Sequence, residues 1–123
     1  MNAENIYKLI EQTFTVNKAL LTEGFINEYL DSRDSKNFDE KWIDAYEHMK
    51  VLSSSNKEFL VQDNTLREKI FKIVVSISSS YELAEYVSDD AGLIYASIFF
   101  NVKNDFIDHL YNCYKKNVLP SWS

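Results

Sequence analysis

The sequence predicts an all-α fold, a single domain over residues 1–123 made of six or seven helices packed in antiparallel fashion. Apolar residues recur at spacings of three and four through most of the chain. Gly occurs twice and Pro once, which is too few for the tight turns of β-sandwiches and barrels. Hydrophobic residues make up 46% of the chain and charged residues 26%, a balance typical of a globular domain.

Two helices are predicted in the N-terminal quarter. Asn2 is the expected N-cap of the first, whose apolar face comprises Ile6, Leu9, Ile10 and Phe14. The β-branched residues from Thr13 to Val16 are expected to loosen this helix before Asn17, the candidate N-cap of the second. The apolar stripe of the second helix comprises Leu20, Leu21, Phe25, Ile26, Tyr29 and Leu30. The segment Asp31 to Lys36, with four charged residues and two serines, is predicted to be a loop.

The middle of the chain predicts two further helices. Asn37 and Glu40 have the spacing of a capping box. The helix that they begin is expected to direct inward Phe38, Trp42, Ile43, Tyr46 and Met49. Ser53 to Asn56 is expected to end it, because serine side chains compete with the helix for backbone groups. The next helix begins at Asn56 or Asp63, and its apolar residues from Leu66 to Ile77 match a period of 3.6.

The last third of the chain predicts two or three helices and a tail. Ser79 and Glu82 form a second candidate capping box after the serines at 78–80, and Ser88 or Asp89 is a possible restart of the helix. Asn104 precedes the final helix, whose Lys115 and Lys116 lie at the negative end of the helix dipole. The tail from Val118 to Ser123 is expected to fold back onto the body.

No set of residues matches a catalytic or metal-binding arrangement. Asp44 and His48 are four residues apart, as are Asp105 and His109, but the Glu-x-x-His signature of helical di-iron sites is absent, so we interpret both as surface ion pairs. Cys113 lies four residues after His109 without an evident third catalytic group, and we interpret it as a structural thiol. We therefore expect no enzymatic activity, no cofactor and no metal.

The charge balance excludes some partners. Nineteen acidic residues against thirteen basic ones give a net charge of −6. Nucleic acid is not expected as a direct partner, because neutralising its phosphates requires clustered Lys and Arg. The stretch Leu93 to Val102 is about half as long as a membrane span, and Met1 to Phe14 lacks a signal-peptide pattern. We expect a soluble cytoplasmic protein that meets a basic protein partner.

Two acidic stretches are the candidate partner-binding regions. The stretch from Glu82 to Asp108 contains six carboxylates and one basic residue, and the stretch from Glu23 to Glu47 contains eight carboxylates and three basic residues. Tyrosines interleave with the first stretch and add the large contact area that protein interfaces favour. The candidate partner-binding residues are Tyr81, Glu82, Glu85, Tyr86, Asp89 and Asp90. The secondary candidates are Asp31, Asp34, Asp39, Asp44 and Glu47.

In its size, acidity, helical character and the tyrosine and carboxylate interleaving from Tyr81 to Asp90, the chain resembles immunity proteins of bacterial toxin systems, such as contact-dependent growth inhibition. The resemblance implies a tight complex with a cognate toxin domain, often a basic nuclease. Under it, the carboxylates of the candidate region mimic phosphates and Tyr81 and Tyr86 act as anchors. The alternative is a helical ligand-sensing or regulatory domain, in which the aromatic residues, 15% of the chain, line a small-molecule pocket.

Overall fold

The all-α fold is confirmed in the computed structural model, which describes residues 2–122. Over this range the chain forms six α-helices, and no strand is present. The helices are α1 (Ala3–Val16), α2 (Glu23–Arg33), α3 (Lys36–Ser53), α4 (Lys57–Ser78), α5 (Tyr81–Phe99) and α6 (Asp105–Lys115). A 3-10 turn, η1 (Lys18–Leu20), follows α1.

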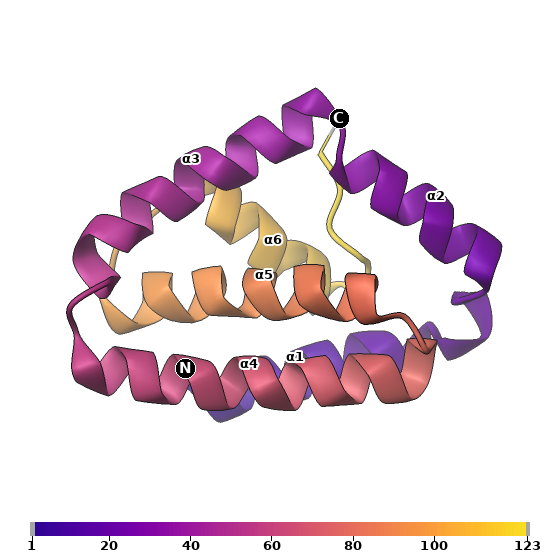
Figure 1. Ribbon diagram of the computed structural model, residues 1–123, viewed down its shortest axis with the longest axis horizontal. Coiled ribbons are helices and arrows are strands. Elements are labelled where there is room, and N and C mark those ends of the chain that lie inside the picture. Colours follow the sequence, from indigo (N-terminus) through magenta and orange to yellow (C-terminus); the bar gives the residue numbers. More distant parts are fainter. Residues whose placement is uncertain (1, 123) are drawn as a thin grey trace.

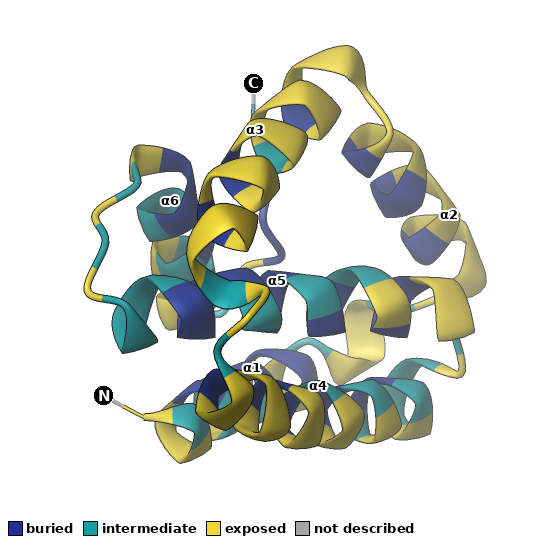
Figure 2. Ribbon diagram, turned by 60° about the vertical axis from the view of Figure 1, so that its left-hand side comes forward, coloured by how far each residue is buried: buried dark blue, intermediate teal, exposed yellow. Residues whose placement is uncertain are grey.

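Helix α5 is the centre of the molecule. It packs antiparallel along α4 and also contacts α1, α3 and α6. Figure 1 shows α2 and α3 forming an arch over α5, with α6 and the C-terminal tail behind it. More residues are buried on α5 than on any other helix, including Leu83, Val87, Ala91 and Ile94. Figure 2 shows the contrast with α4, whose outer face is exposed along its length.

The apolar pattern predicted the core of several helices, including Phe38 and Met49 of α3, but not every residue expected in the core of α3 was buried. Ile6, Ile10 and Phe14 of α1 are buried, as expected. On α3, however, Ile43 is 46% exposed and Tyr46 is 41% exposed, so the expectation that both point inward was wrong. The buried residues of α3 are Phe38, Ala45 and Met49.

Three of the predicted N-caps are confirmed. Asn2 forms a capping box with Asn5, in which each side-chain oxygen accepts a 3.0 Å hydrogen bond from the other residue's backbone N–H. Asn56 caps α4, and Asn104 caps α6. These side chains satisfy backbone N–H groups that a helix leaves unpaired in its first turn.

Other helix boundaries differ from the prediction. Thr22, not Asn17, caps α2, because Asn17 ends α1. Helix α3 begins after Ser35, so Asn37 and Glu40 lie inside it and form no capping box. Ser80 caps α5, while Ser79 has the left-handed φ of 60° that ends α4. Helix α5 then continues without a restart.

The predicted loop from Asp31 to Lys36 is largely helical. Helix α2 continues to Arg33 and α3 begins at Lys36, so only Asp34 and Ser35 connect the two helices. The tail folds back as predicted through residue 122, while Ser123 lies outside the described residues. Leu119 and Pro120 are buried, and the Trp122 ring lies 5.5 Å from that of Phe106.

Candidate partner-binding surface

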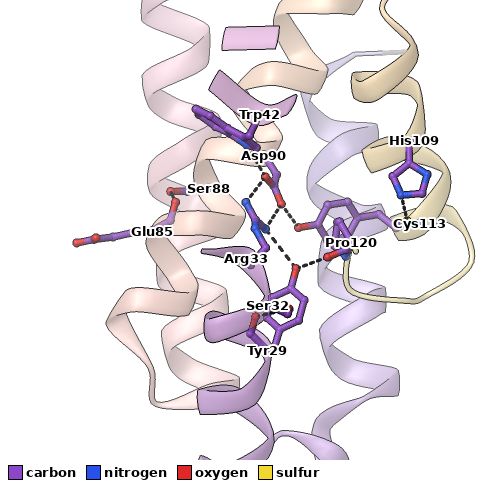
Figure 3. Close-up of polar contacts among 11 residues, drawn as sticks. Tyr29, Ser32, Arg33, Trp42, Glu85, Ser88, Asp90, His109, Cys113 and Pro120 are labelled. Atoms are coloured by element: carbon purple, nitrogen blue, oxygen red, sulfur yellow. Dashed lines mark hydrogen bonds and ion pairs between the residues drawn. The ribbon is translucent and has the colours of Figure 1, made fainter. Parts of the chain in front are cut away.

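A polar network inside the fold positions the surface of α5. Asp90 is fully buried and forms two hydrogen bonds of 2.8 and 2.9 Å with the guanidinium of Arg33 from α2. Its carboxylate also accepts hydrogen bonds from the Trp42 indole N–H at 3.0 Å and from the Tyr114 hydroxyl at 2.7 Å. Figure 3 shows Arg33, Asp90 and Trp42 converging on one point. The network therefore connects α2, α3, α5 and α6.

The tail is tied to the same network. Tyr29 of α2 accepts a hydrogen bond from Arg33 at 3.2 Å and donates one of 2.8 Å to the carbonyl of Pro120. Burial raises the pKa of Tyr29 and of Tyr114, so both hydroxyls remain protonated donors. Burial opposes the charge of Arg33, but Asp90, together with Tyr29 and Tyr114, outweighs burial and raises the pKa of Arg33 above its usual value.

These contacts correct the prediction for Asp90. A side chain that is 0% exposed and accepts four hydrogen bonds cannot reach a partner on the surface of this fold. The physical reason is helical spacing, since residue 90 lies three residues after Val87 and four before Ile94, on the buried stripe of α5. Asp90 stabilises the interior, and its partner Arg33 was assigned to a loop by the sequence.

The other predicted residues of α5 lie together on its outer side. Glu82 and Glu85 are exposed, and Tyr81 is 68% exposed. Residues 82, 85, 86 and 89 follow one another at spacings of three, one and three, so they line one flank of the helix. In Figure 3 the Glu85 side chain points away from the buried network. Over residues 2–122, neither Glu82 nor Glu85 forms an ion pair.

Tyr86 joins this flank to the end of α2. Its hydroxyl donates a 2.7 Å hydrogen bond to the Asp34 carboxylate, and the Arg33 guanidinium lies 5.1 Å from its ring centroid. The hydrogen bond to Asp34, together with burial, raises the pKa of Tyr86 to about 12. Asp34, a secondary candidate, is thus brought next to the primary ones. We call Tyr81, Glu82, Glu85, Tyr86 and Asp34 the acidic flank.

Among the described residues, Asp89, unlike Glu82 and Glu85, is paired with a cation of the same chain. Its carboxylate forms an ion pair with Arg67 of α4, and its side chain is 35% exposed. Burial raises the pKa of Asp89, and Arg67 offsets only part of this. Asp89 also lines a groove between α3, α4 and α5, so it lies between the acidic flank and that groove.

The remaining secondary candidates are exposed but do not share one face. Asp44 and Glu47 are three residues apart on the outer side of α3. Asp39 lies about 140° around the helix from Asp44, on the same side of α3 as Tyr46. Asp31 is exposed one turn before Asp34. The structure thus places Asp34 in the acidic flank through its hydrogen bond with Tyr86, with Asp31 three residues before it on α2, whereas Asp44 and Glu47 lie on α3.

The position of this groove was not predicted, because an aromatic-lined pocket was only the alternative expectation and had no residues assigned to it. It has a volume of about 560 Å³, and α3, α4 and α5 each contribute to it. Its walls include Trp42 and Tyr46, whose rings stack 5.6 Å apart, together with Met49 and Leu60. Its residues come from three separate helices, so no local sequence pattern indicates the groove. The apolar residues of α3 and α4 that do not fit the buried stripe were a partial signal of it.

Of the residues considered for catalysis or metal binding, His109 and Cys113 contact each other and the C-terminal tail. Within residues 2–122, neither Asp44 and His48 nor Asp105 and His109 form the expected ion pair. Cys113 Sγ lies 3.6 Å from His109 Nε2, and the His109 ring also contacts the Ser121 carbonyl and the Trp122 ring. Burial raises the pKa of the Cys113 thiol, which opposes a reactive thiolate. Within the described range, no group of three or more His, Cys, Asp or Glu residues is arranged to hold a metal ion. No helix of that range is long and apolar enough to cross a membrane.

Comparison with known proteins identifies the chain. No curated protein matches it. The family model described as Immunity protein PIM1 matches residues 5–121, which include all six helices apart from the first two residues of α1. The match therefore extends over the buried network, the acidic flank and the groove. The chain belongs to the Immunity protein PIM1 family: it is a toxin immunity protein, and its partner is a cognate toxin.

Proposed function

We propose that this protein neutralises its toxin by binding it through the acidic flank of α5 and α2. The observation that supports the proposal most is that Glu82 and Glu85 are exposed, lie on one side of α5 and have no intramolecular cation within residues 2–122. Carboxylates left without partners are available for Lys and Arg of another protein. They also accelerate its approach by electrostatic steering.

We infer that the toxin domain is basic, and a nuclease is the class that fits best. A nuclease requires a positively charged cleft for phosphates, and an acidic protein with a net charge of −6 is complementary to such a cleft. Tyr81, 68% exposed beside Glu82 and Glu85, adds an amphipathic side chain of the kind enriched at binding hot spots. Immunity would act in the cytoplasm, in a system of the contact-dependent growth inhibition type.

The buried network supports this role by fixing the flank before binding. Asp90 holds α5 to α2 and α3 one turn from Glu85 and Tyr86, and Asp34 is held by Tyr86. A rigid interface loses less conformational entropy when the complex forms, which favours high affinity.

The test is the affinity of the toxin domain for charge-reversal variants. Glu85→Lys and Glu82→Lys are expected to weaken binding at least about tenfold each and to reduce its dependence on salt. Glu68→Lys on the outer side of α4 is the matched control, because it makes the same change of charge at an exposed site. Equal affinity for all three variants and the wild type would remove the acidic flank from the interface. Inhibition of nucleic-acid cleavage by the purified toxin tests the nuclease assignment separately.

A further inference from the structure

The groove between α3, α4 and α5 has a polar floor with unmet hydrogen-bonding capacity. Asp63 of α4 is 7% exposed, and over residues 2–122 its Oδ1 has no hydrogen-bond donor. Its Oδ2 lies 3.8 Å from Arg67 Nη1, which is beyond hydrogen-bond length. Buried polar atoms without partners are uncommon in native proteins, so this carboxylate calls for an explanation.

Carboxylates outnumber guanidinium groups on this floor. Arg67 is hydrogen-bonded to Asp89, and its Nε has no acceptor within the described residues. Asp63 and Asp89 therefore share one cation that serves mainly Asp89. Burial raises the pKa of both carboxyl groups, which is the expected sign when charge is incompletely compensated. A second cationic donor would satisfy the free oxygen of Asp63.

Gly92 of α5 forms part of this floor. A Cβ atom at residue 92 would lie 3.1 Å from Asp63 Oδ1 and 3.2 Å from Arg67 Cδ, which is closer than ordinary van der Waals contact. The absence of a side chain on α5 therefore allows Asp63 and Arg67 of α4 to pack closely against it.

The walls of the groove suit the stem and plane of an arginine. Trp42 and Tyr46 form a stacked aromatic wall, and Lys50, which also lines the groove, has its Nζ 5.8 Å from the Tyr46 ring centroid. Guanidinium groups stack on aromatic faces and pair with carboxylates in bidentate geometry.

Exposed apolar side chains also line the groove. Of the eleven large hydrophobic side chains exposed in the described range, Tyr46 and Leu60 line it, together with the half-buried Trp42 and the buried Met49. Apolar side chains around a polar contact exclude water from it, as at binding hot spots.

We propose that the groove receives an arginine side chain of the cognate toxin, with its guanidinium on Asp63 and Asp89 and its stem against Trp42 and Tyr46. The proposal rests on the proposed function and extends it, because Asp89 borders both the acidic flank and the groove. The interface then has a charged part on α5 and a deeper, partly apolar part between α3 and α4.

Asp63→Asn is the main variant, since it keeps the shape of the side chain and removes its charge. Toxin affinity is expected to fall at least about tenfold for Asp63→Asn, and also for Tyr46→Ala, which removes part of the aromatic wall. Glu68→Gln on the exposed side of α4 and Val16→Ala on α1 are the matched controls, and they are expected to bind like the wild type. Wild-type affinity in both groove variants, with the flank variants still weakened, would overturn the groove proposal and leave the proposed function intact.

A second measurement does not need the toxin. N-acetyl-argininamide is titrated against the isotopically labelled protein, with the neutral isostere N-acetyl-citrullinamide as control, and amide resonances are followed by NMR. Shifts of the Gly92 and Asp63 amides and of the Trp42 indole with the arginine derivative alone support the proposal. Equal responses to the two derivatives, or shifts outside the groove, would overturn it.

Discussion

Removal of the Asp90 carboxylate tests the role of the buried network. In Asp90→Ala, Arg33 is left 4% exposed without its counter-ion, which alone costs about 3–5 kcal/mol in comparable pairs. The Trp42 indole N–H and the Tyr114 hydroxyl lose the acceptor of their hydrogen bonds at 3.0 and 2.7 Å. A chain of this length has a free energy of unfolding of about 6–15 kcal/mol, so the variant is expected to fold with much of its stability lost.

Urea denaturation followed by circular dichroism measures the effect. We expect the free energy of unfolding to fall by at least about 4 kcal/mol for Asp90→Ala and by less than about 0.5 kcal/mol for Glu85→Ala on the exposed side of the same helix. The double variant Arg33→Met with Asp90→Leu is expected to recover much of the loss, because it leaves no unpaired buried charge. A loss below about 1 kcal/mol in Asp90→Ala would refute the reasoning.

Three further predictions concern pH, glycine and capping. Burial raises the pKa of Asp63 from its ordinary 3.8, so the wild type is expected to lose stability relative to Asp63→Asn as pH rises from 3.8 to the folded-state pKa, above which the loss is complete. Urea titrations below and above this window, at about pH 3 and pH 7, that show a constant difference between the two proteins would contradict this. Gly24→Ala should raise the free energy of unfolding by up to about 0.5 kcal/mol, because a Cβ atom at residue 24 meets nothing within 4 Å. Gly92→Ala should raise it by less, because its Cβ atom meets Asp63 and Arg67. The reverse order of stability in thermal melts would be inconsistent with the packing at Gly92. Asn104→Ala removes the 3.0 Å cap on Ile107 N–H and should cost about 1 kcal/mol, whereas Asn112→Ala, in the last turn of α6, should cost less in the same denaturation experiment.

The sequence was sufficient to predict the fold class and the caps that depend on local chemistry. Asn2, Asn56 and Asn104 each precede an apolar period, and the hydrogen bond that each side chain makes lies within the first turn of its own helix. The α2 boundary was missed because its cause is not local. Arg33 is helical and buried since it bonds to Asp90, 57 residues away.

Asp90 was the misassigned residue for which the sequence held a usable signal. It lies at helical spacing between Val87 and Ile94, so its position indicated the core while its charge suggested the surface. Arg33, one of only two arginines in the chain, was its available partner. A charged residue on an apolar stripe is better interpreted as half of a buried pair.

The groove could not be predicted because it depends on how three helices are placed. Tyr46, Leu60 and Gly92 line it from α3, α4 and α5. Periodicity shows which side of each helix is apolar, but not where one helix crosses another. In the sequence, Tyr46 matched an ordinary core position, and Asp63 was considered only as a helix start.

Amide hydrogen exchange of the protein alone and in complex with its toxin domain tests the central claim most directly. Amides of α5 from residue 81 to 89, of the Asp34 and Ser35 connection, and of the groove walls in α3 and α4 are expected to exchange more slowly in the complex. The amides of α1 and the outer side of α6 should be unchanged. Slower exchange confined to α1 and α6, with residues 81–89 unaffected, would contradict the account.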